Sequence, residues 1–388
     1  MDYQTYFQVN LDNFIHNYKQ LKENSGVTKM CAVIKANAYG HGAVKLAREL
    51  EFLGADYLAV ANILEALELR RNGIRLPILV LGYIGEENIS VAIENNISLT
   101  VYSYQMAELI NQKAKNLRKI PKVHVKIDTG MNRLGFQVLV DKDKCIRDIF
   151  KIDKMENVIV EGIFSHFADA DGEDSAFTNE QYKTFIGFLI DLENAGVTIP
   201  IKHIANDPGS IIYGYDMDMI RCGLGLYGYN SSDFVDKNSK LDLRPVGSLY
   251  STVTMVKDVA KNSKIGYNCT YTTDSQTGVA TVAIGYADGY PVELSNKAYV
   301  IINGKKAQIL GKVCMDQLMV DVSFVRDVKV GDRVLLFGEG DGKNLDLKEL
   351  VGMTHSSVYE FLCNVSRRVA RVYTKNGKVV DKMDYLLS

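Results

Sequence analysis

One lysine stands at the end of an apolar run near the start of the chain. The segment Met30–Gly42 reads MCAVIKANAYGHG, in which four apolar residues lead to Lys35 and a turn-rich stretch with Tyr39 follows. A lysine held among buried strands and beside other cations is favoured as the neutral amine, which can act as a nucleophile or as a base. Lys35 is therefore the first candidate for chemistry.

Other polar residues stand at the ends of later apolar runs. They are Lys126, Asp128 and Arg133 at the fifth run, His166 at the sixth, Asn206 and Asp207 at the seventh, and Arg221 at the eighth. Taken singly, a strand-end lysine is usually a solvated rim residue, a lone histidine a structural residue and an arginine an ion-pair partner. Repetition at equivalent strand ends instead predicts a cationic site. Such a site suits a Schiff base with pyridoxal phosphate, whose phosphate would be held by a glycine turn such as Gly223–Gly225.

The elements that must bring these residues together form a repeating pattern. Eight short apolar runs recur, with amphipathic helical segments in most intervals: CAVIKAN, YLAVAN, PILVLGY, LTVYSY, VHVKIDTG, EGIFSHF, KHIAND and IRCGLGLYG. Runs without polar alternation predict strands buried on both faces, hence a parallel sheet covered by helices. Gly73 and Gly196 stand where helices should end. Residues 1–235 are thus predicted to form a (β/α)8 barrel. A doubly wound open sheet that binds a dinucleotide carries its G-x-G-x-x-G turn after the first strand, and the first run here is followed by KANAYGHG instead.

The pattern changes after the polar segment SSDFVDKNSK, which is interpreted as a linker. Residues 236–388 contain alternating or β-branched runs with two hairpin signals, Asn303-Gly304 and Asn376-Gly377, and one helical segment at DLKELVGMTH. A mainly antiparallel β-domain is predicted for this part. The strand-like start of the chain, residues 1–10, is expected to pair with it.

Composition narrows the class of protein. The chain has 388 residues, 47% of them hydrophobic and 24% charged, and a formal charge of -2, which argues against nucleic acid as a partner. No apolar stretch approaches the roughly 18 residues that span a bilayer, so no membrane partner is expected. The beginning lacks the features of a signal peptide, and the six cysteines form no C-x-x-C pair. These features predict a cytoplasmic protein without a metal site or a disulfide framework.

The motifs taken together resemble those of one enzyme family. AVIKANAYGHG, VKIDTGMNRLGF, GIFSHFADAD, DMIRCGLGLYG, IGYNCTY, IGYADGY, GKVCMDQLMVDV and YEFLCNVSRRVARVY occur in the order found in alanine racemases, and the match covers essentially the whole chain. The resemblance implies a pyridoxal-phosphate enzyme of fold-type III, built as a barrel followed by a β-domain. It also implies a head-to-tail homodimer with active sites shared between subunits, and D-alanine supply for cell-wall peptidoglycan.

The same resemblance implies a role for each matching residue. Lys35 would carry the cofactor and serve as the base on one face of the substrate α-carbon, and Tyr267 of the partner subunit would be the base on the other face. Arg221, paired with His166, would contact the pyridine nitrogen. Arg133 would contact the cofactor's phenolic oxygen and the substrate carboxylate, and Lys126 would be a carbamylated lysine that orients Arg133. Met315 and Tyr286 would lie at the substrate entrance, with Asp316 in support. The residues implied around the phosphate are Tyr39, Asn206, Gly223, Leu224 and Tyr359.

Two departures from the family pattern concern the phosphate and the rim. Asp207 and Pro208 replace the family's serine and a small residue, and an ionised Asp207 would repel a phosphate. Asp207 is therefore expected either to turn outward or to leave the phosphate to Ser210. Asn132 stands where glycine or threonine is common.

The alternatives to alanine racemisation are a serine or broad-specificity racemase, a fold-type III decarboxylase and a non-catalytic carrier of pyridoxal phosphate.

Overall fold

The computed structural model describes residues 3–26, 29–340 and 342–387, which group into two compact units. The barrel unit comprises Ile15–Ala38 and Ala43–Leu243, and the β unit comprises Met1–Phe14, Tyr39–Gly42 and Arg244–Ser388. The boundary after residue 235 stays a prediction. Of the segment 1–10 that is predicted to pair with the second domain, residues 1 and 2 lie outside the described residues.

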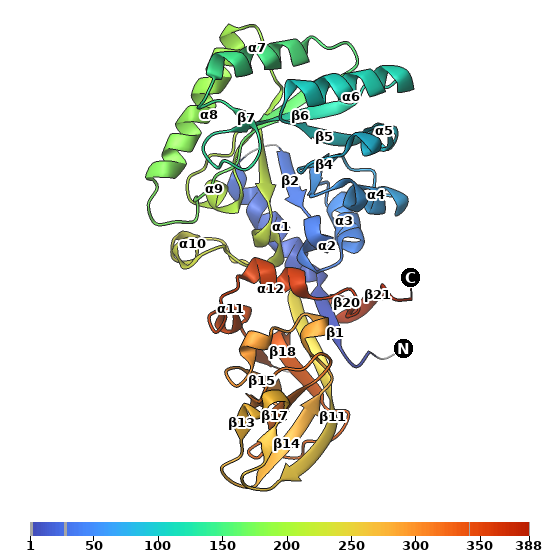
Figure 1. Cartoon of the computed structure of the whole chain (residues 1–388), viewed down its shortest axis with the longest axis vertical. Helices are drawn as coiled ribbons and strands as arrows, with labels where there is room; N and C mark the ends of the chain where they lie inside the picture. Colours follow the sequence, from blue (N-terminus) through green and yellow to red (C-terminus); the bar gives the residue numbers. More distant parts are fainter. Residues whose placement is uncertain (1–2, 27–28, 341, 388) are drawn as a thin grey trace. The chain divides into compact units, whose positions relative to one another are not determined.

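The barrel unit is built on eight parallel strands, as the apolar runs predict (Figure 1). In spatial order they are β10 (Met219–Cys222), β2 (Lys29–Val33), β3 (Tyr57–Val60), β4 (Ile78–Val80), β5 (Ile97–Val101), β6 (Lys122–Asp128), β8 (Ile159–Phe164) and β9 (Ile201–His203), with β7 (Phe136–Gln137) paired to β6. Arg221 N donates to Ala205 O at 3.1 Å and Asp218 N to Lys202 O at 3.0 Å, which links the two ends of this order. The predicted (β/α)8 fold is confirmed as a nearly closed barrel.

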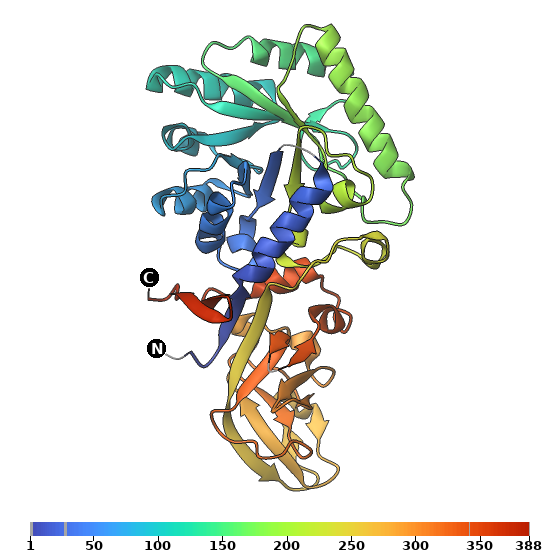
Figure 2. The same ribbon diagram turned by 180° about the vertical axis from the view of Figure 1, so that it is seen from behind.

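The longer helices lie on the outside of these strands, and Figure 2 shows the longest, α8, from behind. The helices between Leu11 and Asn238 are α1 (Leu11–Ser25), α2 (Lys35–Tyr39), α3 (Ala43–Phe52), α4 (Ile63–Arg71), α5 (Glu86–Glu94), α6 (Tyr104–Leu117), α7 (Lys142–Asp153), α8 (Ala176–Asn194), α9 (Asp207–Ile211), the 3-10 helix η1 (Leu224–Tyr227) and α10 (Asp233–Asn238). Gly73 and Gly196 follow α4 and α8 with φ of 83°, as expected for residues that end helices. The segment SSDFVDKNSK, interpreted as a linker, contains the short helix α10, which Ser232 caps through a hydrogen bond from Val235 N. Within the described ranges, no helix is long and apolar enough to cross a membrane.

The β unit is organised around a ten-stranded sheet. Its order is β19 (Lys343–Leu345), β18 (Arg333–Gly340), β15 (Tyr299–Ile302), β16 (Lys305–Leu310), β17 (Leu318–Asp321), β14 (Thr277–Val282), β11 (Gly247–Val259), β1 (Tyr6–Asn10), β20 (Ala370–Lys375) and β21 (Lys378–Met383). β1 lies between β11, its antiparallel neighbour, and β20, its parallel one. A further pairing of β11 with β18 turns most of the sheet into a closed ring. The prediction of a mainly antiparallel domain is confirmed.

Turns and short helices complete the β unit. Asn303-Gly304 has φ of 46° and 73°, Asn376-Gly377 has 52° and 70°, and both pairs join antiparallel strands, which confirms the two predicted hairpins. The short elements are the two-stranded β12 (Lys264–Ile265) and β13 (Tyr271–Thr272), the 3-10 helices η2 (Tyr267–Cys269), η3 (Tyr286–Asp288) and η4 (Val292–Leu294), and the helices α11 (Leu347–Val351) and α12 (Val358–Asn364). α11 lies in the predicted helical segment, whereas α12 was not expected.

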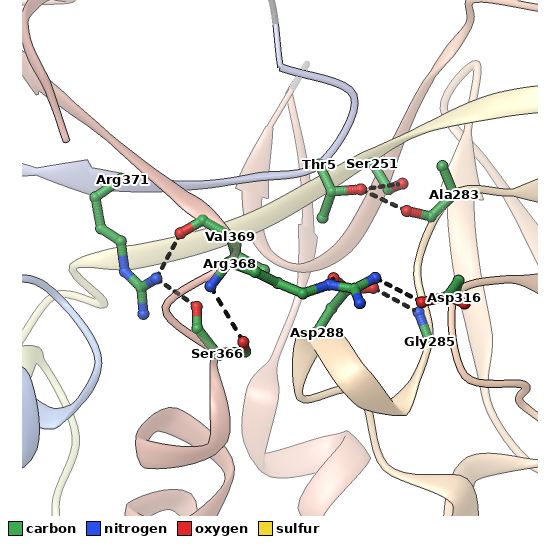
Figure 3. Close-up of polar contacts among 10 residues, drawn as sticks. All are labelled: Thr5, Ser251, Ala283, Gly285, Asp288, Asp316, Ser366, Arg368, Val369 and Arg371. Carbon is green, nitrogen blue, oxygen red and sulfur yellow. Dashed lines mark hydrogen bonds and ion pairs between the residues drawn. The ribbon is translucent and has the colours of Figure 1, made fainter. Parts of the chain in front are cut away.

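A buried arginine holds the segment 39–42 within the β unit. Arg371 on β20 has no exposed surface. Its guanidinium donates to Gly40 O at 2.8 Å and Val365 O at 2.7 Å, and to the carbonyls of Ser366 and Val369 (Figure 3). Since a guanidinium can only donate hydrogen bonds, four carbonyl oxygens match its chemistry well.

Replacing Arg371 with methionine should lower the free energy of unfolding by about 3 kcal/mol or more, because four buried carbonyls lose their donor. Chemical denaturation of the purified chain measures this change. Arg367→Met is the matched control, since Arg367 is exposed and stands over the Tyr385 ring at 5.1 Å. Equal losses in the two variants would show that the carbonyl cluster does not stabilise the fold.

Candidate active site

Lys35 lies at the carboxyl end of β2, where the chain enters a left-handed turn. The segment from Lys35 to Tyr39 is α2, but Ala36, Asn37 and Ala38 have φ of 51°, 55° and 54°, and Tyr39 has 50°. Non-glycine residues in this region cost roughly 1–2 kcal/mol each, so the turn needs support from its surroundings.

Glu65 on α4 provides part of that support. Its Oε1 accepts from Ala36 N at 2.7 Å, and its Oε2 accepts from Ala61 N at 2.7 Å. Ala38 N donates to Ile34 O at 2.9 Å. The carboxylate therefore fixes the backbone on the C-terminal side of Lys35 from a neighbouring helix. The sequence shows Glu65 only as one charge of an amphipathic helix, so its role was not predicted.

Arg221 on β10 is the best-anchored cation at the mouth of the barrel. It is 4% exposed, and its Nη1 contacts Nδ1 of His203 at 2.9 Å. Its Nη2 donates to Ser165 O and Ile204 O at 2.9 Å and contacts Nδ1 of His166 at 2.8 Å. Burial lowers the pKa of Arg221 to about 10, so that it stays protonated at neutral pH. The predicted Arg221–His166 pair is present.

The partners of Arg221 determine the proton positions in a chain of histidines. Because the guanidinium only donates, His166 and His203 accept at Nδ1 and carry their protons at Nε2. His203 then donates from Nε2 to Nδ1 of His124 at 2.9 Å, and Nε2 of His124 faces Glu161 Oε2 at 3.5 Å. Burial, and then the Arg221 charge, lowers the pKa values of His166 and His203 well below the usual value. Neutral imidazoles thus connect Arg221 with a carboxylate inside the barrel.

Lys126 on β6 is a buried amine close to Arg221. It is 6% exposed, donates to Ile127 O at 2.7 Å and stands 5.5 Å from the centre of the Phe164 ring. Burial, then the positive charge of Arg221, lowers the pKa of Lys126 to about 7, while Asp128 opposes the shift. A substantial fraction of Lys126 is therefore an uncharged amine at neutral pH.

Arg133 is presented by a loop that Asp128 shapes. Asp128 Oδ1 accepts from Gly130 N at 2.9 Å and from Asn132 N at 3.1 Å. Asn132 has φ of 55°, a conformation that asparagine tolerates better than most residues. The Arg133 side chain is exposed, and its charge contributes to the lowered pKa of His166.

A buried glutamine, which the sequence analysis missed, holds the His166 segment. Gln181 on α8 is fully buried. Its amide donates to His166 O at 3.1 Å and Thr129 Oγ1 at 3.3 Å, and its Oε1 accepts from Ala168 N at 2.9 Å. A glutamine on the apolar face of the helix EQYKTFIGFLIDLENAG is the signal that could have pointed to it.

The predicted phosphate residues of the barrel unit surround a carboxylate. Asn206 caps α9 by accepting from Gly209 N at 3.1 Å. Asp207 is 7% exposed, and Gly223 N lies 3.1 Å from both of its carboxylate oxygens, while Gly225 N lies 3.1 Å from Oδ2. Leu224, between the two glycines, is buried. The expectation that Asp207 turns outward is wrong, because these backbone N–H groups hold it inside.

The β unit brings together three residues predicted at the substrate entrance. Tyr286 N donates to Cys314 O at 3.0 Å, so that η3 lies against the segment carrying Met315. Gly285 is required there, because a Cβ at this position would collide with the carbonyl oxygens of Cys314 and Met315. Tyr267, in η2, is 69% exposed and lines the same hollow as Met315 and Asp316.

An arginine fixes the spacing of these segments, as Figure 3 shows. Arg368 Nε donates to Asp288 Oδ1 at 2.7 Å, and its Nη2 donates to Asp316 Oδ1 at 2.7 Å. Asp288 also accepts from Gly285 N at 2.9 Å. Arg368 thus connects the turn of Tyr286 with the segment of Met315. Elsewhere in the unit, the predicted phosphate residues Tyr39 and Tyr359 have ring centres 6.0 Å apart.

Family models match both parts of the chain. Residues 9–231 match the alanine racemase N-terminal domain, and residues 246–373 match the alanine racemase C-terminal domain. The chain is 42% identical over 386 residues to alanine racemase 2 of Caldanaerobacter subterraneus subsp. tengcongensis, covering 98% of each protein.

Solved structures agree with the family models. The alanine racemase structure of Clostridium difficile 630 superposes with a TM-score of 0.93 at 41% identity, covering 100% of both chains. A histidine racemase from Leuconostoc mesenteroides subsp. sake also superposes, with a TM-score of 0.88 at 28% identity, covering 96% of this chain and 98% of that one. By its two family domains and its near full-length relatives, the chain belongs to the alanine racemase family of isomerases.

Proposed function

We propose that the chain interconverts L- and D-alanine with pyridoxal phosphate as cofactor and with Lys35 and Tyr267 as its two bases. The observation that carries the proposal is Arg221, a buried guanidinium anchored by His203 and His166 at the mouth of the barrel. An arginine that faces the pyridine nitrogen keeps its own proton, so the nitrogen stays unprotonated. That arrangement favours racemisation over chemistry that needs a stronger electron sink, decarboxylation included.

The described residues fit pyridoxal phosphate at its ring end. Lys35 would hold its aldehyde carbon, Arg221 its pyridine nitrogen and Arg133 its phenolic oxygen. When bound, the cofactor withdraws electrons from the substrate α-carbon and so acidifies its proton. At the phosphate end, the backbone N–H groups of Gly223 and Gly225 converge on one anion, which in this structure is the Asp207 carboxylate. Tyr39, Asn206, Leu224 and Tyr359 are the further candidates for phosphate contacts.

Inversion at one carbon explains the need for two bases. One base removes the α-proton from one face and the other returns a proton to the opposite face. Lys35, at the end of β2, is proposed for one face and Tyr267 of a partner subunit for the other. His166 carries its proton at Nε2, and it would stabilise a phenolate by donating from there. Arg133 would hold the substrate carboxylate, which fixes the α-carbon between the bases.

The proposed partner is a second copy of this chain. Tyr267 and Met315 are 69% and 52% exposed, and Met255, 49% exposed, lines the same hollow. Exposed apolar side chains around a hollow are typical of an interaction surface. A head-to-tail homodimer would cover them and would supply Tyr267 and Met315 to the site of the neighbouring subunit, with Tyr286 beside them.

Lys126 is proposed to carry a carbamate. Its uncharged amine can attack carbon dioxide with release of a proton, and the product, a negative group, would pair with Arg133. Because the pKa of Lys126 is about 7, the reaction should proceed above that pH and fail below it, where the ammonium form dominates.

Carbon-13 NMR of the protein in labelled bicarbonate should therefore show a carbamate signal above pH 7, and Lys126→Met should abolish it. Lys122→Met is the matched control, because Lys122 lies on the same strand but pairs with Glu161 at its exposed end. A signal that survives Lys126→Met would assign the carbamate to another amine.

Assay of the chain against L-alanine, L-serine and L-histidine with added pyridoxal phosphate tests the proposed function. L-alanine should give D-alanine fastest, up to an equal mixture. Faster turnover of serine would favour the alternative of a serine or broad-specificity racemase, and release of carbon dioxide would indicate a decarboxylase. Cofactor binding without turnover of any substrate would indicate a carrier. Supply of D-alanine to peptidoglycan in the cytoplasm is the cellular role that we infer from the family.

A further inference from the structure

The buried carboxylate of Asp207 lies where an anionic ligand would be expected. Asp207 begins α9, immediately after the cap residue Asn206. Its oxygens receive the N–H groups of Gly223 and Gly225, residues that follow β10. Convergent backbone N–H groups of this kind bind anions in proteins. The chain thus fills its own anion cradle with a side chain.

The surroundings of Asp207 provide hydrogen bonds but little positive charge. The side chain facing it is the Cys222 thiol of β10. Near Cys222 lie Asp216 in the α9–β10 loop, the Cys31 thiol on β2, the Tyr18 phenol on α1 and the Arg221 guanidinium of the same strand. Arg221 is the one cation of this set, and the other groups are acidic or uncharged. The cradle is also tight, because a Cβ on Gly225 would stand 3.2 Å from the Leu21 side chain and 3.4 Å from Cγ of Asp207.

A carboxylate and a phosphate cannot both use these N–H groups while both are charged. Each is an acceptor, and two anions in contact repel each other strongly at a buried site. A protonated carboxyl, in contrast, is a donor and can give its O–H to a phosphate oxygen. The chemistry of the cradle thus allows the phosphate to enter when Asp207 takes up a proton.

We propose that Asp207 is an internal competitor for the phosphate of pyridoxal phosphate, so that cofactor binding by this chain takes up one proton at Asp207. The inference rests on the proposed function, because it assumes that the cofactor phosphate binds at Gly223 and Leu224. Asp207 is a positioning residue in this account, since it governs the phosphate and does not touch the reacting atoms. It replaces the neutral hydroxyl expected from the family pattern with a group whose charge depends on pH.

The direction of the pH effect follows from the charge of Asp207. Burial raises the pKa of Asp207 to about 6, so the carboxyl is protonated below that pH and charged above it. The dissociation constant for pyridoxal phosphate should therefore rise about tenfold for each pH unit above 6, relative to a variant without this carboxyl. At pH 8 this amounts to about 100-fold.

The test compares the full-length wild-type chain with Asp207→Ser and Asp207→Asn by titration with pyridoxal phosphate and with pyridoxal from pH 5.5 to 8.5. Binding is read from cofactor absorbance and from proton uptake in calorimetry. Both variants should bind pyridoxal phosphate more tightly than wild type above pH 6 and equally at pH 5.5. Pyridoxal, which lacks the phosphate, should bind all three chains alike. Asp207→Asn keeps the shape of the side chain and guards against a folding defect of the serine variant.

Two results would overturn the inference, and they differ in what else they overturn. If pyridoxal phosphate binds with the same pH dependence to all three chains, Asp207 does not compete and only this inference fails. If none of the chains binds pyridoxal phosphate at any pH, the proposed function fails together with the inference.

Discussion

Lys35→Ala is expected to lower the rate of alanine racemisation by about 10³-fold or more and to abolish the visible absorbance of bound cofactor. Both effects have one cause, because the same amine is proposed to hold the cofactor and to exchange the substrate α-proton. Glu65 supports the turn that follows Lys35 through Ala36 N, so the backbone should keep its shape when the side chain is removed. Absorbance spectra and a chiral assay of alanine measure the two effects.

Lys29→Ala is the matched control for this variant, since Lys29 begins β2 at the opposite end from Lys35. It should leave both the absorbance and the racemisation unchanged. Retention of the absorbance in Lys35→Ala would assign the cofactor to a different lysine and refute the proposed site.

Tyr267→Phe is expected to slow racemisation by roughly 10² to 10⁴-fold in both directions, because the base for one face is lost. The losses in kcat/KM must be equal in the two directions, since enantiomers have an equilibrium constant of one. The asymmetry should appear in exchange of the α-proton with deuterated water. One enantiomer should still exchange, through Lys35, while the other should not.

Proton NMR of L- and D-alanine in deuterated water measures the two exchange rates. Tyr271→Phe, four residues further along the same segment, should leave racemisation and both exchange rates unchanged. If Tyr267→Phe lowers exchange of both enantiomers by the same factor, the two bases do not act on separate faces.

The sequence predicted the architecture well, because each buried parallel strand gives a continuous apolar run. Such a run can be recognised in the sequence without knowing which strand it pairs with. The hairpin at Asn303-Gly304 was equally clear, because the Asn-Gly pair by itself favours the two positive φ angles that a tight hairpin turn needs. The short helix α12 and the helix α10 were not predicted, because a few residues give too little periodicity.

The sequence predicted which residues gather at the site, but not the hydrogen bonds that connect them. Arg221 and His166 stand at strand ends, so their proximity followed from the barrel. The direction of the Asp207 side chain did not, because it depends on N–H groups of Gly223 and Gly225 that are sixteen and eighteen residues away. Gln181 was missed for the same reason: its hydrogen-bond partners lie in the segments that follow β6 and β8, and the helix pattern around it is that of an ordinary core-facing helix.

Mixing the two inactive variants tests the central claim most directly. If Lys35 and Tyr267 act in one site that is formed by two subunits, a dimer of one Lys35→Ala chain and one Tyr267→Phe chain contains one intact site. After unfolding and refolding of an equal mixture, about one quarter of wild-type racemase activity should return, because about half of the dimers are mixed and each has one of two sites intact. A mixture no more active than the separate variants would contradict a shared site.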